Sequence, residues 1–325
     1  MAGKSAVPVV DCRSASLGRE LLSASHDPGI FYLVGHGIDT VLLDSVLGEL
    51  GAFFALSTEE KQSISIKQSS NFRGYGVLKN YRDWREQIHL ALEGDLGDGP
   101  EDYWRLWGKN QWPERPQFKS VMVSYLGAVE ELSRLLLGEL AAALDKERGF
   151  FTDRMENPYL LVKGMAYFPQ EKRYDQDGKE VVSSQSGVMA HCDWSWLTFL
   201  LQDDVGGLFA QSLDGEWHDV APLPGSLIVN TGELLELESG GYLRACPHKV
   251  LNRSVEKPRF SLPVFVNPGL DQRIYPLPVS VCDSDGEHVH KVVEPGSVLD
   301  DFVFGESEWR RKGLGHWCYR ESCLD

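Results

Sequence analysis

Two histidines and one aspartate have types and spacings that could bind a metal ion. Asp193 follows His191 by two positions, and His191 alone among the nine histidines has a carboxylate at that spacing. The pair precedes the apolar run WLTFLLQ, which is typical of a strand. Residues i and i+2 of an extended chain point to the same side, so both side chains can reach one ion. His248, 57 residues after His191, is the candidate third ligand because the intervening strands can return the chain to the same sheet edge.

This donor set favours iron(II) over structural zinc. Two imidazoles and one carboxylate on one face leave three octahedral positions open, whereas a structural zinc site is closed. A His-x-Asp pair is a weak signal alone, and a single histidine in a β-rich protein is more often a hydrogen-bonded core or surface residue. Cys192 and Cys246 lie next to the pattern and would suit zinc, but Cys192 should alternate to the opposite face from its neighbours. The same-face pair His288 and His290 is expected to be exposed.

A second pair, Arg259 and Ser261, could bind an anion. Both lie at the start of the strand-like run RFSLPVFV and share one face of it, so a guanidinium group and a hydroxyl group converge. Arg259 follows His248 by 11 residues, which places it beside the metal strand. A dicarboxylate that chelates iron at one end would need a cation such as Arg259 at the other. Without this spacing, Arg259 would be interpreted as a surface cation.

Apolar periodicity predicts the elements that position these side chains. Strands are expected at residues 7–11 and 30–34 with a short helix between them, and helices are expected from Thr40, after Ser57, at 118–144 and at 298–311. Residues 62–116 are predicted to be irregular. From Tyr159 onward, short apolar runs separated by turns predict antiparallel β structure. We expect one domain, mainly β with flanking helices: a mostly helical part at 1–157, a double-sheet core at 158–270, and a final strand and helix at 271–325.

Composition limits the partners. The 325 residues are 42% hydrophobic, and the net charge is −16, with 48 acidic and 32 basic residues. Nucleic acids and anionic membranes should be repelled, whereas a local arginine can still bind a small anion. We expect a cytoplasmic protein with six reduced cysteines, because no signal-like or membrane-spanning apolar run and no C-x-x-C pair is present. A monomer is favoured.

Segments over nearly the whole chain resemble the isopenicillin N synthase-like 2-oxoglutarate/iron(II) dioxygenases, with the deacetoxycephalosporin C synthase-type microbial enzymes nearest. They are VPVVD, GIFYLVGHGI, NQWPERPQF, HCDWSWLTFLLQDDVGGL, GSLIVNTGE, HKVLNRS and RFSLPVF. The resemblance implies a double-stranded β-helix, also called a distorted jelly roll. It also implies Fe(II) bound by His191, Asp193 and His248, 2-oxoglutarate bound by Arg259 and Ser261, and O2 as the oxidant.

The resemblance extends to supporting residues, with one departure. Asn230 and Glu233 fall in a segment that lines or supports the pocket in the family. Many relatives carry Asn-x-Tyr-Pro before the metal motif, and its two polar side chains help to hold the co-substrate; the matching stretch here is AYFPQ, with Ala166 and Phe168 in their places. Tyr167 of this stretch is still expected to contact the co-substrate. Arginines that the cephalosporin-type enzymes carry just before it are Gly164 and Ala166 here.

The implied reaction couples decarboxylation of 2-oxoglutarate to oxidation of a small molecule through a high-valent iron species. Hydroxylation, desaturation and oxidative cyclisation all remain open. The substrate is expected to be amino-acid-derived or another secondary metabolite, and Arg73 and Lys163 indicate an acidic one. The predicted substrate contacts are Arg73, Tyr75, His89, Lys163, Trp194, Trp196 and Phe265.

Two alternatives remain open at this point. One is an oxidase of the same fold that takes electrons from its substrate or from ascorbate instead of 2-oxoglutarate. The other is a non-catalytic binding protein that retains a metal pocket.

Overall fold

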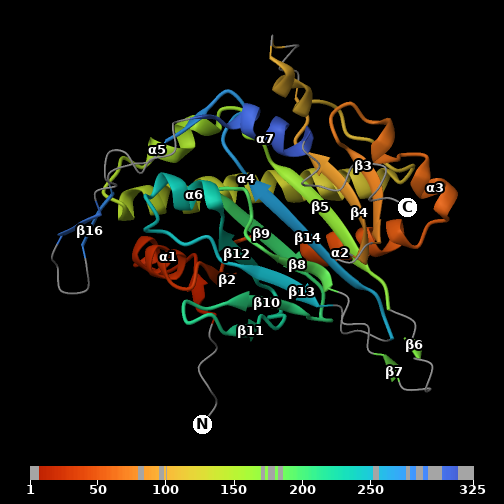
Figure 1. The fold of residues 1–325 in the computed structure, drawn as a ribbon, viewed down its shortest axis with the longest axis horizontal. Helices are drawn as coiled ribbons and strands as arrows, with labels where there is room; N and C mark the ends of the chain where they lie inside the picture. Colours follow the sequence, from red (N-terminus) through yellow and green to blue (C-terminus); the bar gives the residue numbers. More distant parts are fainter. Residues whose placement is uncertain are drawn as a thin grey trace.

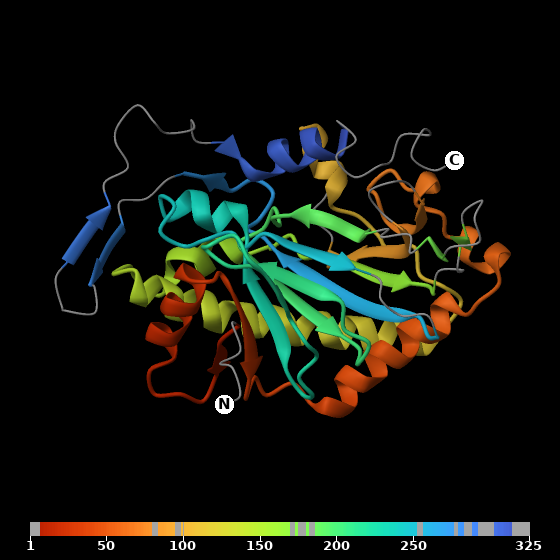
Figure 2. The same cartoon turned by 60° about the horizontal axis from the view of Figure 1, so that its bottom comes forward.

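The computed structural model describes residues 7–79, 84–94, 99, 101–169, 173–174, 180–181, 186–251, 256–275, 279–282, 288–291 and 302–313. Two β-sheets pack face to face, and long helices cover the outer face of the larger sheet (Figures 1 and 2). This arrangement confirms the predicted mainly β fold with flanking helices.

In the part of the chain that the structure describes, the strand pairs of the two sheets are antiparallel except for β1 with β2, which is parallel. The larger sheet has the order β1 (Val9–Asp11), β2 (Ile30–Val34), β12 (Leu227–Thr231), β9 (Leu197–Gln202), β14 (Arg259–Val266), β5 (Leu161–Tyr167), β4 (Trp84–Ala91), β3 (Gly74–Lys79). The smaller has the order β11 (Trp217–Asp219), β10 (Leu208–Gln211), β13 (His248–Leu251), β8 (Ser186–His191). Three strand pairs lie outside these sheets: β6 (Arg173–Tyr174) with β7 (Glu180–Val181), β15 (Arg273–Ile274) with β18 (Phe302–Val303), and β16 (Val279–Cys282) with β17 (His288–Lys291).

The helices differ widely in length. The α-helices are α1 (Leu17–His26), α2 (Thr40–Phe54), α3 (Thr58–Gln62), α4 (Pro116–Ala143), α5 (Gly149–Thr152), α6 (Glu233–Glu238) and α7 (Phe304–Gly313). The 3-10 helices are η1 (Ile66–Gln68), η2 (Asp102–Leu106) and η3 (Asp153–Met155). As a local example, Ser57 begins α3 with a capping box, since its hydroxyl accepts from the Glu60 N–H while the Glu60 carboxylate accepts from the Ser57 N–H. No helix in the described ranges is both long and apolar enough to cross a bilayer.

Two apolar layers hold these elements together. The larger layer lies between the outer face of the eight-stranded sheet and the helices, and it includes Leu50 of α2, Leu136 of α4 and Phe199 of β9. The smaller layer lies between the sheets and includes Tyr32 and Val250. Successive side chains along each strand of the larger sheet therefore point alternately toward the helices and toward the smaller sheet.

The region 62–116 was predicted to be irregular, and that prediction is wrong for β3 and β4, which extend the larger sheet. In β4 the side chains of Arg85, Gln87 and His89 are buried, with 7%, 3% and 0% exposure. Because a strand is usually recognised from apolar residues on its buried face, polar residues there conceal it. The predicted helix at 298–311 is observed as α7, and its predicted beginning lies outside the described residues.

A buried ion pair joins the helix layer to the loop between β8 and β9. Glu238 at the end of α6 is fully buried and accepts hydrogen bonds from Arg154 Nη2 at 3.2 Å and Trp196 Nε1 at 2.8 Å. Burial raises the pKa of Glu238, and Arg154 opposes this. At the other end of α6, the Glu233 N–H donates to the Asp193 carbonyl at 2.8 Å. The pair therefore anchors the loop that carries Asp193.

We expect Arg154→Leu to lower the free energy of unfolding by about 3–5 kcal/mol, because it leaves the Glu238 carboxylate buried without its cation. Denaturant unfolding measures the loss. Arg13→Leu removes an arginine from the exposed ion pair with Asp11 and should cost far less. Equal losses in the two variants would contradict this account of Arg154.

Candidate active site

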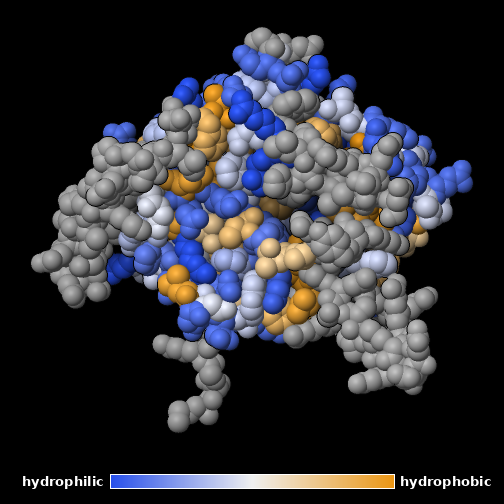
Figure 3. All heavy atoms as spheres, in the orientation of Figure 1, coloured by the Kyte–Doolittle hydropathy of each residue, from blue (hydrophilic) through white to orange (hydrophobic). Residues whose placement is uncertain are grey.

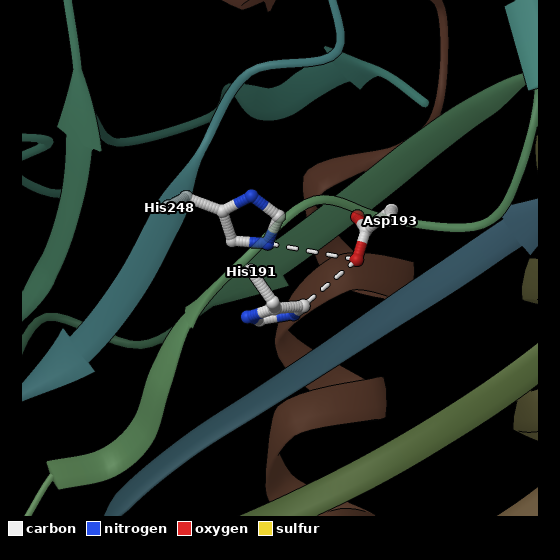
Figure 4. Close-up of side chains that lie close together, drawn as sticks. All are labelled: His191, Asp193 and His248. Atoms are coloured by element: carbon white, nitrogen blue, oxygen red, sulfur yellow. Dashed lines mark ion pairs between the residues drawn. The ribbon is translucent and has the colours of Figure 1, made fainter. Parts of the chain in front are cut away.

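Strand pairing brings the three candidate metal ligands together. His191 ends β8, Asp193 lies in the loop that follows, and His248 begins β13 directly opposite His191 in the antiparallel register. The Asp193 Oδ1 atom lies 3.5 Å from His191 Nε2 and 3.6 Å from His248 Nε2, and the three side chains converge (Figure 4). All three donor atoms lie within 4.8 Å of one another. Donors bound about 2.1 Å from one ion are roughly 3–4 Å apart, so the spacing suits a shared ion.

Hydrogen bonds to neighbouring groups orient each donor. The Nδ1 atoms of His191 and His248 lie 2.9 Å and 3.0 Å from the carbonyl oxygens of Met189 and Cys246. Since a carbonyl only accepts, Nδ1 carries the proton in each ring and Nε2 presents its lone pair to the centre. Asn230 Nδ2 donates to Asp193 Oδ2 at 3.0 Å, which leaves Oδ1 for the metal. Asn230 thus supports the centre, as the sequence predicted.

The electrostatics favour the metal-binding protonation states. Burial by itself would raise the pKa of Asp193, but the neighbouring His248, the hydrogen bond with His191 and the hydrogen bond from Asn230 lower it overall, so the carboxylate is ionised. Burial lowers the pKa of His248, although Asp193 opposes this, so the ring is neutral at neutral pH. A neutral imidazole and an ionised carboxylate are the forms that bind a metal.

The donor chemistry fits iron(II) rather than a thiolate zinc site. Burial raises the pKa of the Cys192 thiol to about 12, so no thiolate is present beside the centre at neutral pH. The Cys192 Sγ atom also faces the Ala245 carbonyl, at 3.5 Å, and is absent from the converging group. Two nitrogen ligands and one oxygen ligand on one side leave the opposite side open to the adjacent cavity.

A cavity of about 280 Å³ lies between the two sheets and includes all three candidate ligands in its wall. Its lining combines apolar side chains such as Leu200, Pro263 and Val250 with about as many polar ones. A recess on this face, near the strands β8, β13 and β14, has hydrophobic and hydrophilic surface side by side (Figure 3). A concave wall that combines apolar surface with convergent polar groups is typical of a small-molecule site.

Arg259 and Ser261 lie in the same cavity wall, on the inner face of β14. The Arg259 guanidinium donates to Ser261 Oγ at 3.2 Å and Gln202 Oε1 at 2.9 Å, while its Nε has no partner. Burial lowers the pKa of Arg259, and in the described part of the chain no carboxylate lies within 4.0 Å of it. Asp203 interacts with Arg259 electrostatically but forms no ion pair with it. A buried guanidinium group with no directly paired carboxylate is suited to an anionic ligand.

The strand β5 explains the missing Asn-x-Tyr pair. Met165 and Tyr167 line the cavity, whereas Ala166 and Phe168 belong to the apolar layer on the helix side. The apolar side chains at 166 and 168 therefore face away from the cavity. Tyr167 faces the cavity, and the Arg259 guanidinium carbon lies 5.1 Å from the centre of its ring.

The structure brings some predicted substrate contacts to the cavity and leaves others away from it. Lys163, Trp194 and Phe265 are in the lining, and the Lys163 Nζ atom lies 4.8 Å from the Phe265 ring centre. Those outside the lining, all buried, are Arg73, Tyr75, His89 and Trp196.

The side chains away from the cavity have structural partners of their own. Arg73 donates to the backbone carbonyls of Asn71 and Leu106, and the Tyr75 hydroxyl donates to Glu86. His89 shares the inner face of β4 and pairs with Lys163 in register, but lies beyond the cavity. Trp196 is bound to Glu238. Glu233 supports the site through its backbone, and its side chain is not in the lining.

Sequence reasoning missed several polar side chains in the cavity wall, among them Arg85, Gln87 and Arg311. Arg85 donates to the Gly187 carbonyl at 3.2 Å and so connects β4 to β8. The alternation of polar residues at 85, 87 and 89 was the available signal for β4. Arg311 lies near the C-terminal end of α7, and nothing local in the sequence indicates which helix residues face a cavity.

Comparison with known proteins agrees with the geometry. Residues 7–115 match the profile of the non-haem dioxygenase in morphine synthesis N-terminal family, and residues 161–268 match the 2OG-Fe(II) oxygenase superfamily. A homoarginine-6-hydroxylase from Glycine max is 32% identical over 304 residues, covering 88% of this chain and 89% of that protein. A 2-oxoglutarate-Fe(II) type oxidoreductase from Emericella nidulans is 31% identical, covering 90% of this chain and 84% of that protein.

Solved structures agree on the fold. A Neurospora crassa protein crystallised with alpha-KG and thymine superposes with a TM-score of 0.78 at 20% identity, covering 97% of this chain and 98% of that one. Together with the profiles and relatives, this places the chain in the 2OG-Fe(II) oxygenase superfamily, whose fold has a jelly-roll core. It is an Fe(II)/2-oxoglutarate-dependent oxygenase, and the family uses Fe(II), 2-oxoglutarate and O2.

Asn230→Ala should weaken iron(II) binding by about 10- to 100-fold, because Asp193 loses the hydrogen bond that orients it. Anaerobic calorimetric titration with iron(II) measures the affinity. Asn267→Ala removes another buried amide, one that donates to the Tyr159 carbonyl, and serves as the matched control. Identical affinities in wild type and Asn230→Ala would show that this hydrogen bond does not orient a ligand.

Proposed function

We propose that this chain oxidises an amino-acid-derived or other secondary metabolite at an iron(II) centre held by His191, Asp193 and His248. The observation that carries the proposal is the convergence of two Nε2 lone pairs and one ionised carboxylate oxygen on one point of the cavity wall. When bound there, iron(II) would activate O2, the oxidant, while 2-oxoglutarate would be oxidised to succinate and CO2.

The protein side chains bind, orient and shield the reactants. Arg259 and Ser261 bind the far carboxylate of 2-oxoglutarate, and Gln202 holds the guanidinium in place through its bond to Nη2. Tyr167, against Arg259, restricts the guanidinium to one side of its ring. Apolar side chains such as Leu200 and Pro263 line the cavity beside the centre and would contact the carbon chain of a substrate bound there.

Relatives with different substrates support a small-molecule substrate. The Glycine max relative is named for hydroxylation of homoarginine, and a Melia azedarach relative, 29% identical over 280 residues, is an azadirone synthase. The cavity of about 280 Å³ also suits a small organic molecule. With a net charge of −16, we further propose that the enzyme acts as a monomer in the cytoplasm without nucleic acid or membrane.

The deciding experiment measures succinate against oxidised product. Purified protein with iron(II), O2 and 2-oxoglutarate is screened against amino-acid derivatives, starting with L-homoarginine, and should release one succinate per product molecule. His191→Ala should abolish both. Turnover without succinate would instead indicate an oxidase that uses electrons from its substrate or from ascorbate. Ligand binding that survives His191→Ala with no O2 uptake by wild type would indicate a binding protein.

Arg259→Gln should raise the KM for 2-oxoglutarate by about 10- to 100-fold, because the charge that pairs with the far carboxylate is lost. Arg259→Lys keeps the positive charge but cannot make bidentate hydrogen bonds to a carboxylate, so its KM for 2-oxoglutarate should be intermediate. Steady-state succinate formation at varied 2-oxoglutarate concentration gives these values. Arg244→Gln, which removes an arginine bonded to the Pro28 carbonyl, is the control and should leave the KM unchanged.

A further inference from the structure

Besides Arg259 Nε, two nitrogen donors in the described part of the cavity wall have no hydrogen-bond acceptor. The Trp194 Nε1 and Arg311 Nε atoms are both shielded from solvent and unpartnered, and both residues line the cavity. The two side chains touch, since the Arg311 guanidinium carbon lies 4.4 Å from the centre of the Trp194 ring. The wall therefore presents an indole N–H and a guanidinium side by side.

Packing fixes this pair close to the metal ligands. Trp194 directly follows Asp193 in the chain, and its ring stacks on Phe302 with a centroid separation of 5.9 Å. Phe302 lies in β18, which leads into α7, the helix that carries Arg311. In Figures 1 and 2, α7 lies over the end of the sheets from which the metal-bearing loop emerges. The pair is thus held from two separate parts of the chain.

An unpartnered buried donor costs free energy unless a ligand supplies the acceptor. Within the described ranges the Arg311 Nε atom has no hydrogen-bond partner, and the guanidinium packs on the Trp194 ring. Asn and Gln side chains could supply such an acceptor from the protein, yet none of the described ones reaches either donor. The acceptor expected at this position is therefore a group of the ligand.

The charge of the surroundings indicates an anionic acceptor. The ionised side chains of the cavity wall are the cations Arg85, Lys163, Arg259 and Arg311 and one carboxylate, Asp193. Glu233 is the acidic group that interacts with Arg311 from α6; burial raises the pKa of Glu233 and Arg311 opposes this. Glu233 interacts with Arg311 electrostatically but does not line the cavity. Among the described lining residues, Asp193 is the one carboxylate, and it lies at the metal-ligand cluster.

We propose that Trp194 and Arg311 form a subsite for a carboxylate of the substrate. The carboxylate accepts from the indole N–H and the guanidinium, and this anchors the substrate beside Asp193 with its carbon chain extending toward the metal. The subsite rests on the proposed function, because it defines the class of molecule that the iron centre oxidises. The substrate class is a small carboxylic acid, and the second anion in the cavity is distinct from 2-oxoglutarate at Arg259.

Binding of matched acids and amides tests the subsite. The protein is loaded with Mn(II), which replaces iron without turnover, and with saturating 2-oxoglutarate. Isothermal titration then measures the affinity for three pairs of probes: L-homoarginine and L-homoargininamide, phenylacetate and phenylacetamide, and hexanoate and hexanamide. Wild type should bind at least one acid about 10- to 100-fold more tightly than its amide, as expected for a charge-assisted hydrogen bond.

Variants locate the preference. Arg311→Gln should reduce the affinity for the acid to that for the amide while the amide binds as before. Trp194→Phe keeps the ring and its packing, removes the N–H, and should reduce acid binding by about 3- to 10-fold. Arg310→Gln removes a neighbouring arginine whose side chain is 78% exposed and should change nothing.

Three results would overturn the subsite: no acid binds wild type, acids and amides bind equally, or Arg311→Gln weakens both members of a pair alike. The last result would mean that Arg311 only holds the Trp194 ring in position and does not contact the carboxylate. Affinities for Mn(II) and 2-oxoglutarate are measured in the same samples. If wild type binds neither, the proposed function fails; if it binds both and the acid preference is missing, the subsite alone fails.

Discussion

A buried carboxylate that must stay ionised is the constraint on which this structure depends. Asp193 is 4% exposed, and burial in an apolar interior strongly disfavours a charge. Two imidazole rings and one amide offset that cost, and the same arrangement leaves one carboxylate oxygen directed at the two Nε2 atoms. In the iron-bound protein the cation completes the compensation, so metal binding and stability of this loop are linked.

The double-sheet fold meets this constraint by turning one sheet face into a polar interior. Each inner strand presents alternate residues to the cavity, which places Arg259 and Ser261 on β14, Arg85 and Gln87 on β4, and Asn230 on β12 around one volume. The opposite faces of the same strands are apolar and pack on the helices. The helix layer therefore supplies the hydrophobic stabilisation that permits so many buried polar groups on the other side.

Long-range anchors keep the loop carrying Asp193 in place. The ion pair of Arg154 with Glu238 joins the segment after α4 to α6, and the first turn of α6 binds the Asp193 carbonyl. From the opposite side, Phe302 and Arg311 pack on Trp194. Residues from well-separated parts of the chain thus hold one short loop, which keeps its donor atoms in a fixed position without a ligand.

The sequence by itself determined the chemistry and most of the scaffold. The i, i+2 spacing of His191 and Asp193 follows from strand geometry, which is local, and the strong apolar periods of α2, α4 and β9 are likewise local signals. Tertiary structure alone decided which distant side chains share the cavity. Arg73 and Trp196 are residue types that often bind ligands, yet here they are buried and hydrogen-bonded to Leu106 and Glu238. Arg311 lines the cavity because α7 packs beside it. Cross-strand register and helix docking depend on contacts between residues far apart in sequence, and no local pattern encodes them.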